Sequence, residues 1–392
     1  MTIERSHRIT QPATPHRFIA LDSLRGIAAL AIAYFHLQGD GLLLGSTFHS
    51  RLAIAVDFFF VLSGFVIFAS YHERLAQGFS AGRFMFLRIA RLWPLHVTIV
   101  LAFVGLELVP LIFGDGSGAF SGRRSLETLP ANLLLLQTYV HPEGMTWNGP
   151  SWSISVELGL YVLAAILLSR IPRAAPFVFA ILAVAAGITL MSVDWKAYPD
   201  FAFGATAVLR GIGGFGFGVL AAYLWLRLPS AALWQRRAGW LELATAAIAL
   251  AVIAWPMGML TNHIVFALMV FVFAFDVGPL SRGLAMRGFV WIGLVSYSIY
   301  LVHPLVYRFV FPALALIERQ TGIALVASQA NGQLAIAPQG IAAEATALLC
   351  LAAVLVAAGI AYAFIERPTR EWSRRIAAKH SAARAEAIAP TI

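Results

Sequence analysis

The sequence predicts an all-α protein, a polytopic membrane helix bundle of about ten transmembrane helices. Two observations carry this prediction. The 392 residues are 60% hydrophobic and only 12% charged, whereas ordinary soluble domains have about 25% charged residues. The apolar residues also gather in runs of about 20, which is the length that a helix needs to cross a bilayer.

Ten runs are long enough to span: 18–37, 52–70, 93–113, 151–169, 174–191, 202–226, 240–257, 261–277, 289–311 and 341–365. An eleventh apolar stretch, 129–139, is too short to cross comfortably. We expect the segment 129–140 to be re-entrant or interfacial. The sequence thus predicts a cytoplasmic tail at 1–17, a transmembrane domain at 18–365 and a basic cytoplasmic tail at 366–392.

The distribution of Lys and Arg sets the predicted orientation, because cytoplasmic loops are enriched in these residues. With ten spans and a cytoplasmic N-terminus, the inner segments hold 20 Lys and Arg and the outer segments hold five. We therefore expect both termini on the cytoplasmic side of the inner membrane. The net charge of +9 reflects this topology, and no nucleic-acid partner is expected.

The first apolar run carries three ionisable residues, Asp22, Arg25 and His36. Arg25 and His36 are eleven positions apart, which returns to nearly the same helix face about 16 Å further along. Asp22 lies within ion-pair reach of Arg25. Because such groups are costly in hydrocarbon, they predict a polar passage through the protein.

Other polar residues fall mostly in the predicted outer halves of the spans. They are Asp57, Glu157, Arg210, Ser296, Tyr300 and His303, and Trp147 lies in the outer segment 114–150. Each has a structural alternative, such as capping a helix or bonding a neighbouring helix. Together they are hard to explain by packing alone, since apolar residues would pack there at lower cost.

Arg88 and Arg91 precede Trp93 and Pro94, which we expect to begin the third span at the interface. Three residues apart, the two arginines are suited to holding phosphates, although the topology rule alone also predicts arginines here. The glycine-rich stretch 211–218 resembles a nucleotide loop, but close helix packing through Gly214 and Gly218 is the better interpretation. No metal-binding or serine-hydrolase motif is present.

Seven stretches, in order, resemble the acyltransferase-3 family of membrane O-acyltransferases. LDSLRGIAALAIAYFH places Arg25 and His36 in the family's Arg–ten residues–His pattern. The others are VDFFFVLSGFVIF (56–68), the Arg88–Arg91 pair, WSISVEL (152–158), Arg210 with 215–218, SYSIYLVH (296–303) and FIERP (364–368). The resemblance covers nearly the whole chain.

This resemblance implies transfer of an acyl group, usually acetyl from cytoplasmic acetyl-CoA, to a hydroxyl of an extracytoplasmic glycan or lipid-linked sugar. Without a fused further domain, the chain is expected to complete transfer alone or with an extracytoplasmic partner acyltransferase. His36 is the candidate general base or transient acyl carrier, oriented by Asp57 or Glu157. Arg88 and Arg91 would hold the CoA phosphates and Arg25 the pantetheine path or the thioester oxygen.

The expected substrate-binding residues are Trp147, Trp152, Arg210, Ser296, Tyr300 and His303, and no metal is expected. Two other classes remain open at this point. A secondary transporter also has many spans with midplane charges, but the two related halves typical of transporters are not evident. An export subunit of a polysaccharide assembly system would not need the histidine.

Overall fold

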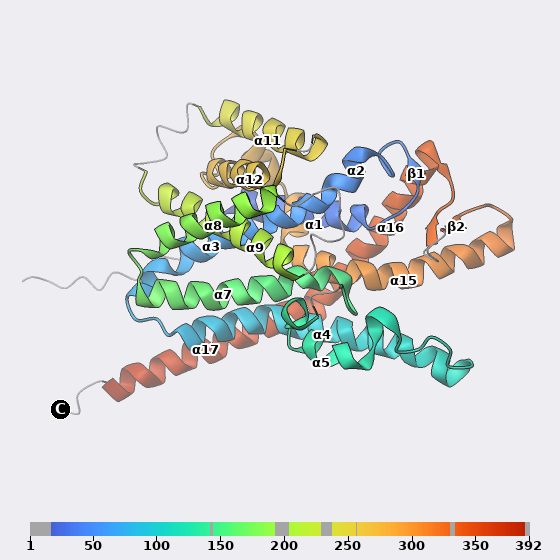
Figure 1. Ribbon diagram of the computed structural model, residues 1–392, viewed down its shortest axis with the longest axis horizontal. Helices are drawn as coiled ribbons and strands as arrows, with labels where there is room; N and C mark the ends of the chain where they lie inside the picture. Colours follow the sequence, from blue (N-terminus) through green and yellow to red (C-terminus); the bar gives the residue numbers. More distant parts are fainter. Residues whose placement is uncertain are drawn as a thin grey trace, which may run out of the picture.

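The computed structural model describes residues 17–141, 144–192, 204–228, 237–255, 257–329 and 334–388. In this part of the chain the protein is helical apart from very short strands, and most helices run along the long axis of the molecule (Figure 1). Six of the described helical stretches are long and apolar enough to cross a membrane, and three further apolar helices are shorter. The all-α prediction is confirmed, while the count of ten spans stays a prediction.

The first half of the chain forms α1 (Ile19–Phe35), α2 (Thr47–Arg51), α3 (Ala55–Ala76), α4 (Ala81–Phe113), α5 (Leu129–Leu133), α6 (Gln137–Val140) and α7 (Trp152–Arg170). The second half forms α8 (Ala175–Met191), α9 (Gly204–Trp225), α11 (Ala238–Ala254), α12 (Met259–Phe273), α13 (Pro279–Leu284), α14 (Arg287–Leu294), α15 (Ser296–Thr321), α16 (Gly340–Ala361) and α17 (Arg367–Ile388). Strands β2 (Val326–Ser328) and β3 (Leu334–Ile336) pair antiparallel, and β1 (Asp40–Gly41) lies beside residues 339–340.

The expected start of the third span at Trp93–Pro94 is wrong. Helix α4 begins at Ala81 and continues through Pro94 and Pro110. Ser80 caps it by accepting the Arg83 amide at 3.4 Å. Residues 77–80 are all that separates α3 from α4, so Arg88 and Arg91 lie on a helix rather than in a loop.

Two other segments have a definite local structure. The stretch 129–140 forms the short helices α5 and α6, of five and four residues, and neither could cross a bilayer. A π-helical turn, Tyr362–Glu366, joins α16 directly to α17, so the predicted C-terminal tail begins as a helix. Helix α17 lies along α4, where the Trp372 ring is 6.2 Å from the Phe86 ring.

Glycines allow α3 and α9 to pack with their backbones in contact. A Cβ at Gly218 would collide with the Val61 carbonyl, and one at Gly64 would collide with the Phe215 carbonyl. A Cβ at Gly214 would come within 2.7 Å of the Phe60 Cβ. The predicted close packing through Gly214 and Gly218 is confirmed, and it joins the helix that carries Asp57 to the one that carries Arg210.

We expect Gly218→Ala to destabilise the protein by about 1–3 kcal/mol or more, since the added methyl group overpacks a backbone contact. Thermal unfolding in detergent measures the change. Gly105→Ala is the matched control, because Gly105 lies on α4 with nothing within 4 Å of the new methyl group. Equal melting temperatures for the two variants would contradict the role given to the α3–α9 contact.

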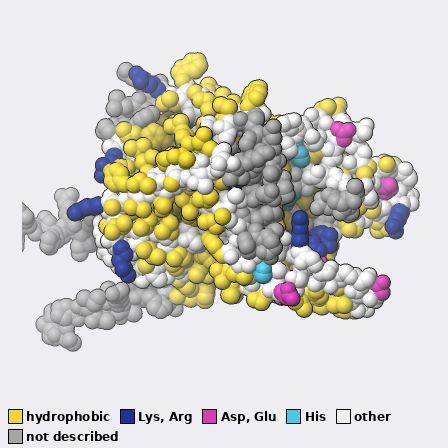
Figure 2. Space-filling model, viewed as in Figure 1, with side chains coloured by type: hydrophobic (Ala, Val, Ile, Leu, Met, Phe, Trp, Pro, Cys, Tyr) yellow, Lys and Arg dark blue, Asp and Glu magenta, His cyan; other side chains and the backbone are white. Residues whose placement is uncertain are grey.

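The surface has a broad apolar band (Figure 2). Helix α16 contributes strongly, with Leu348 64%, Leu349 70% and Val356 65% exposed, which is typical of a lipid-facing helix. On the face shown, Lys and Arg lie at the left end and again toward the right, where Asp and Glu also lie. The predicted orientation stays a prediction. The apolar surface and the long apolar helices together indicate a multi-pass membrane protein.

Candidate active site

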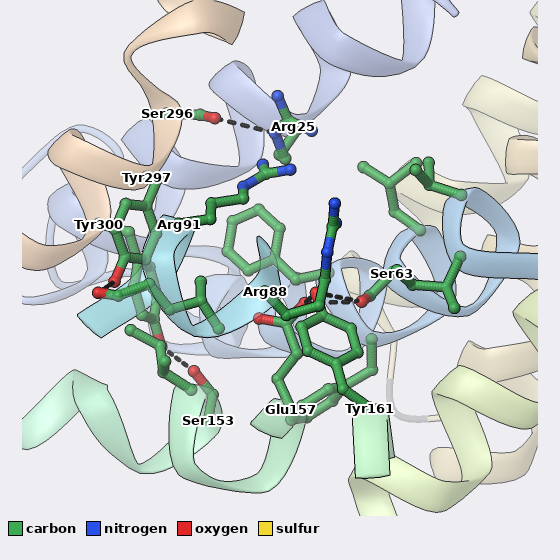
Figure 3. Close-up of a pocket in the computed structure, with 17 residues that line it drawn as sticks. Arg25, Ser63, Arg88, Arg91, Ser153, Glu157, Tyr161, Ser296, Tyr297 and Tyr300 are labelled. Carbon is green, nitrogen blue, oxygen red and sulfur yellow. Dashed lines mark hydrogen bonds between the residues drawn. The ribbon is translucent and has the colours of Figure 1, made fainter. Parts of the chain in front are cut away.

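A cavity of about 100 Å³ lies among α1, α3, α4, α7 and α15 (Figure 3). We call it the arginine cavity, because Arg25, Arg88 and Arg91 all line it. Figure 3 shows the three side chains directed toward the same side of the cavity. Its other polar lining residues are Ser63, Ser153, Glu157, Tyr161, Ser296, Tyr297 and Tyr300.

Arg25 is fixed by contacts on three helices, α1, α14 and α15. Its Nη2 lies 3.0 Å from the Asp22 carboxylate, which confirms the predicted ion pair. Its Nε donates to Ser296 Oγ at 2.9 Å and its Nη2 to the Gly293 carbonyl at 3.2 Å. A Cβ on Gly293 would come within 2.5 Å of the Asp22 carbonyl, so glycine is needed for α14 to approach α1 this closely.

Arg88 and Arg91 are almost one turn apart on α4 and enter the same cavity. Arg88 donates to the Tyr71 hydroxyl at 3.0 Å, with its guanidinium 5.1 Å from the centre of that ring. Arg91 makes no hydrogen bond or ion pair with the residues that the structure describes. Three guanidinium groups around one small cavity favour an anionic ligand.

Glu157 also lines the arginine cavity, but it does not contact His36. Its carboxylate accepts the Ser63 hydroxyl at 2.6 Å and the Tyr161 hydroxyl at 2.5 Å. Both partners were missed from the sequence. Tyr161 follows Glu157 by one helical turn, and this i,i+4 spacing is the signal that could have found it.

A second, larger cavity of about 1080 Å³ lies toward the other ends of α1, α4 and α15. We call it the histidine cavity, because His36 lines it. Its aromatic lining residues are Phe35, Phe103, Trp147, Tyr307 and Phe311, and its basic ones are Arg123, Arg124 and Arg308. The His36 ring therefore faces an opening in the protein.

His36 and His303 form a pair with ring centroids 4.8 Å apart. The Nδ1 atom of His36 bonds the Ile32 carbonyl at 2.8 Å, and the Nδ1 atom of His303 bonds the Ile299 carbonyl at 3.2 Å. Because a carbonyl only accepts, each neutral ring carries its proton on Nδ1 and has a lone pair on Nε2. The Nε2 of His303 is buried and has no partner in the described part of the chain.

One layer of side chains separates the two cavities. Tyr300 lines the arginine cavity, and its hydroxyl donates to the Pro150 carbonyl at 2.8 Å, while Pro150 lines the histidine cavity. Ser153 Oγ lies 2.8 Å from the same hydroxyl. The Tyr300 ring is 6.2 Å from the His303 ring, so Tyr300, His303 and His36 form a continuous row between the cavities.

Asp57 does not orient His36. It forms a bidentate pair with Arg210, at 2.8 and 3.1 Å, and accepts from His263 Nε2 at 3.1 Å. The side chains of all three are 0% exposed. The cluster joins α3, α9 and α12, and is too enclosed for the catalytic role that we expected of Asp57.

Arg210 and Trp152, which we expected to contact substrate, line neither the arginine cavity nor the histidine cavity. The Arg210 guanidinium stacks over the Trp152 ring at 5.1 Å, and Trp152 is only 4% exposed. His263 was missed from the sequence. It is an ionisable residue inside the apolar run 261–277, which is the signal that selected Asp57 and Arg210.

The remaining expected residues divide between the two cavities. Ser296 and Tyr300 line the arginine cavity, Trp147 lines the histidine cavity, and His303 lies beside His36. Glu366, in the FIERP stretch, accepts the Ser298 hydroxyl at 2.8 Å and pairs with Arg370 at 3.3 Å. This carboxylate ties the start of α17 to α15.

Comparison with known proteins identifies the family of the chain. Residues 18–366 match the family described as an acyltransferase domain, the acyltransferase-3 type, and the chain belongs to this family. It is 34% identical over 158 residues to "Protein 2 in picA locus" of Rhizobium radiobacter, covering 37% of this chain and 78% of that protein.

The chain is also 34% identical over 165 residues to "Acyltransferase MdmB" of Streptomyces mycarofaciens. That match covers 38% of this chain and 39% of the relative's length. No solved structure matches the chain significantly. The family and the named relative together support a role in acyl transfer by a membrane protein.

Proposed function

We propose that this protein transfers a short acyl group, such as acetyl, from acyl-CoA to a hydroxyl of a glycan or lipid-linked sugar on the far side of the inner membrane. The observation that carries the proposal is the contact between His36 and His303. It links a basic cavity at one side, through Tyr300, to a large cavity at the other.

The arginine cavity is the proposed donor site. Arg88 and Arg91 supply cations for the CoA phosphates, and Arg25 bonds Ser296, one turn before Tyr300 on α15. The cavity of about 100 Å³ has room for several water-sized groups. This size favours a short acyl group over a long chain.

The histidine cavity is the proposed acceptor site, with His36 as the general base. Its Nε2 lone pair removes the proton from the acceptor hydroxyl as the oxygen attacks the thioester carbonyl. Collapse of the tetrahedral intermediate breaks the carbon–sulfur bond, and the thiolate of CoA leaves and takes up the proton. The Ile32 carbonyl holds the His36 ring in the required tautomer.

In a second version of the mechanism, His36 carries the acyl group transiently. Incubation of purified protein with labelled acetyl-CoA and no acceptor, followed by rapid denaturation at neutral pH, at which an acyl imidazole survives longer than in acid, distinguishes the two. Label on the peptide that contains His36 would support the carrier, and an unlabelled peptide would support the base.

Two measurements test the proposed activity. Mass spectrometry of envelope polysaccharides and lipids, from cells with and without the protein, identifies an acyl ester whose presence requires the gene. Purified protein in nanodiscs is then expected to form that ester from labelled acetyl-CoA with release of free CoA. Loss of the protein with no change in any acyl ester would contradict the proposal.

We expect Arg91→Gln to raise the KM for acyl-CoA about tenfold or more, with a smaller effect on kcat. A charge-assisted hydrogen bond contributes about 1.5–3 kcal/mol, and Arg91 is not committed to a described partner. Initial rates over a range of acyl-CoA concentrations separate the two constants. Arg173→Gln is the control, since Arg173 is exposed between α7 and α8, and equal KM values would remove Arg91 from the donor site.

A further inference from the structure

The described lining of the histidine cavity is positively charged. Arg123, Arg124 and Arg308 line it, and no Asp or Glu is among its described lining residues. Arg123 and Arg308 are exposed and form no hydrogen bond or ion pair through their side chains with the described part of the chain. A proposed site for a sugar hydroxyl needs no cation, so these three residues require another explanation.

Arg124 is held in position by Glu107. Its Nη1 lies 2.7 Å from Glu107 Oε1, and its guanidinium lies 5.4 Å from the centre of the Phe103 ring. The second oxygen of Glu107 accepts the Phe120 amide at 3.2 Å. The buried carboxylate of Glu107 thus fixes both the Arg124 side chain and the backbone of the segment that carries Arg124.

Trp147 is placed beside these arginines at a conformational cost. Its φ is 53°, in the left-handed region that a bulky residue rarely adopts. Its amide donates to the Arg123 carbonyl at 2.9 Å and its Nε1 to Thr128 Oγ1 at 3.0 Å. These bonds fix the buried Trp147 ring in the cavity wall, beside the segment that carries Arg123 and Arg124.

We propose that the acceptor is anionic, a sugar whose phosphate is bound by Arg123, Arg124 and Arg308 while its hydroxyl reaches His36. This inference rests on the proposed function, because it assigns the acceptor class of the same site. A phosphate bound by arginines would also fix which hydroxyl of the sugar reaches the base. The same chemistry is offered by a free sugar phosphate and by a sugar on a polyprenyl phosphate.

Binding measured without acyl-CoA tests this inference independently of catalysis. Purified full-length protein in phosphatidylcholine nanodiscs is titrated with glucose 1-phosphate, polyprenyl-phosphate-linked glucose and the neutral methyl glucoside. We expect at least one phosphate-bearing probe to bind roughly 10- to 100-fold more tightly than methyl glucoside, from one or two charge-assisted contacts. Preference for glucose 1-phosphate indicates a soluble acceptor, and preference confined to the polyprenyl probe indicates a lipid-linked one.

Variants show whether the arginines cause the preference. We expect Arg123→Gln and Arg308→Gln each to lose most of the preference for phosphate-bearing probes. Arg308→Lys is expected to retain part of this preference, and the control Arg173→Gln is expected to retain all of it. Size-exclusion chromatography checks that each variant is folded.

Equal affinity for the charged and neutral probes, or a preference that survives the double Arg123→Gln, Arg308→Gln variant, would overturn the inference. CoA could also compete with the phosphate-bearing probes for the wild-type protein but not for Arg308→Gln. This result would place the donor in the histidine cavity and would likewise overturn the inference. Absence of acyl transfer with the arginine-dependent preference intact would instead count against the proposed function alone.

Discussion

Replacement of His36 by Gln is expected to lower acyl transfer by about 10²- to 10⁴-fold, the usual contribution of a general base. Gln keeps a polar side chain next to His303 but has no basic nitrogen. The protein is expected to remain folded, because His36 is only half-buried at the end of α1. Initial rates with saturating acetyl-CoA measure the loss.

His72→Gln is the matched control for that experiment. Its Nδ1 bonds the carbonyl four residues earlier, that of Phe68, at 3.2 Å, which repeats the local contact of His36. His72 lines neither cavity. If both variants retain wild-type rates, or both lose them equally, His36 is not the base.

Asp57→Ala is expected to have the largest effect on stability, about 3–5 kcal/mol, because it removes the carboxylate that balances a buried charge. Arg210 is 0% exposed and would lose both bonds to the carboxylate. Thermal unfolding in detergent, together with the yield of monodisperse protein, measures the effect.

The double variant Asp57→Ala, Arg210→Met removes the charge as well as its partner. We expect it to recover much of the stability, since an apolar replacement of a whole buried pair is often neutral. Such recovery would show that the cluster packs α3 against α9. A stable Asp57→Ala variant that has lost acyl transfer would instead return Asp57 to the catalytic site.

Apolar run length predicted the helices well, because the cost of exposing backbone polar groups in hydrocarbon leaves few alternatives to a helix. Helix ends were less predictable. Pro94 was expected to begin a helix, but α4 starts at Ala81, since the residues before Pro94 are good helix formers with a serine cap.

The spacing of Arg25 and His36 on one face of α1 predicted one polar path, and the structure places the two residues in separate cavities. The sequence did not predict which side chains bond to each other when their helices are far apart in the chain. Asp57 and Glu157 lie at similar predicted depths to His36, yet depth does not determine which helices are neighbours. The bonds of Asp57 to Arg210 and His263 depend on the glycine contact between α3 and α9, which fixes the register of the two helices.

The central claim is that the two cavities open to opposite sides of the membrane, and a sidedness assay tests it most directly. Protein is reconstituted into sealed liposomes in one orientation, and acyl-CoA and the acceptor identified by mass spectrometry are supplied on chosen sides. We expect ester formation when acyl-CoA is on the side of α17 and the acceptor is on the other side. Ester formed only when both substrates share one side would contradict a path across the membrane through His36.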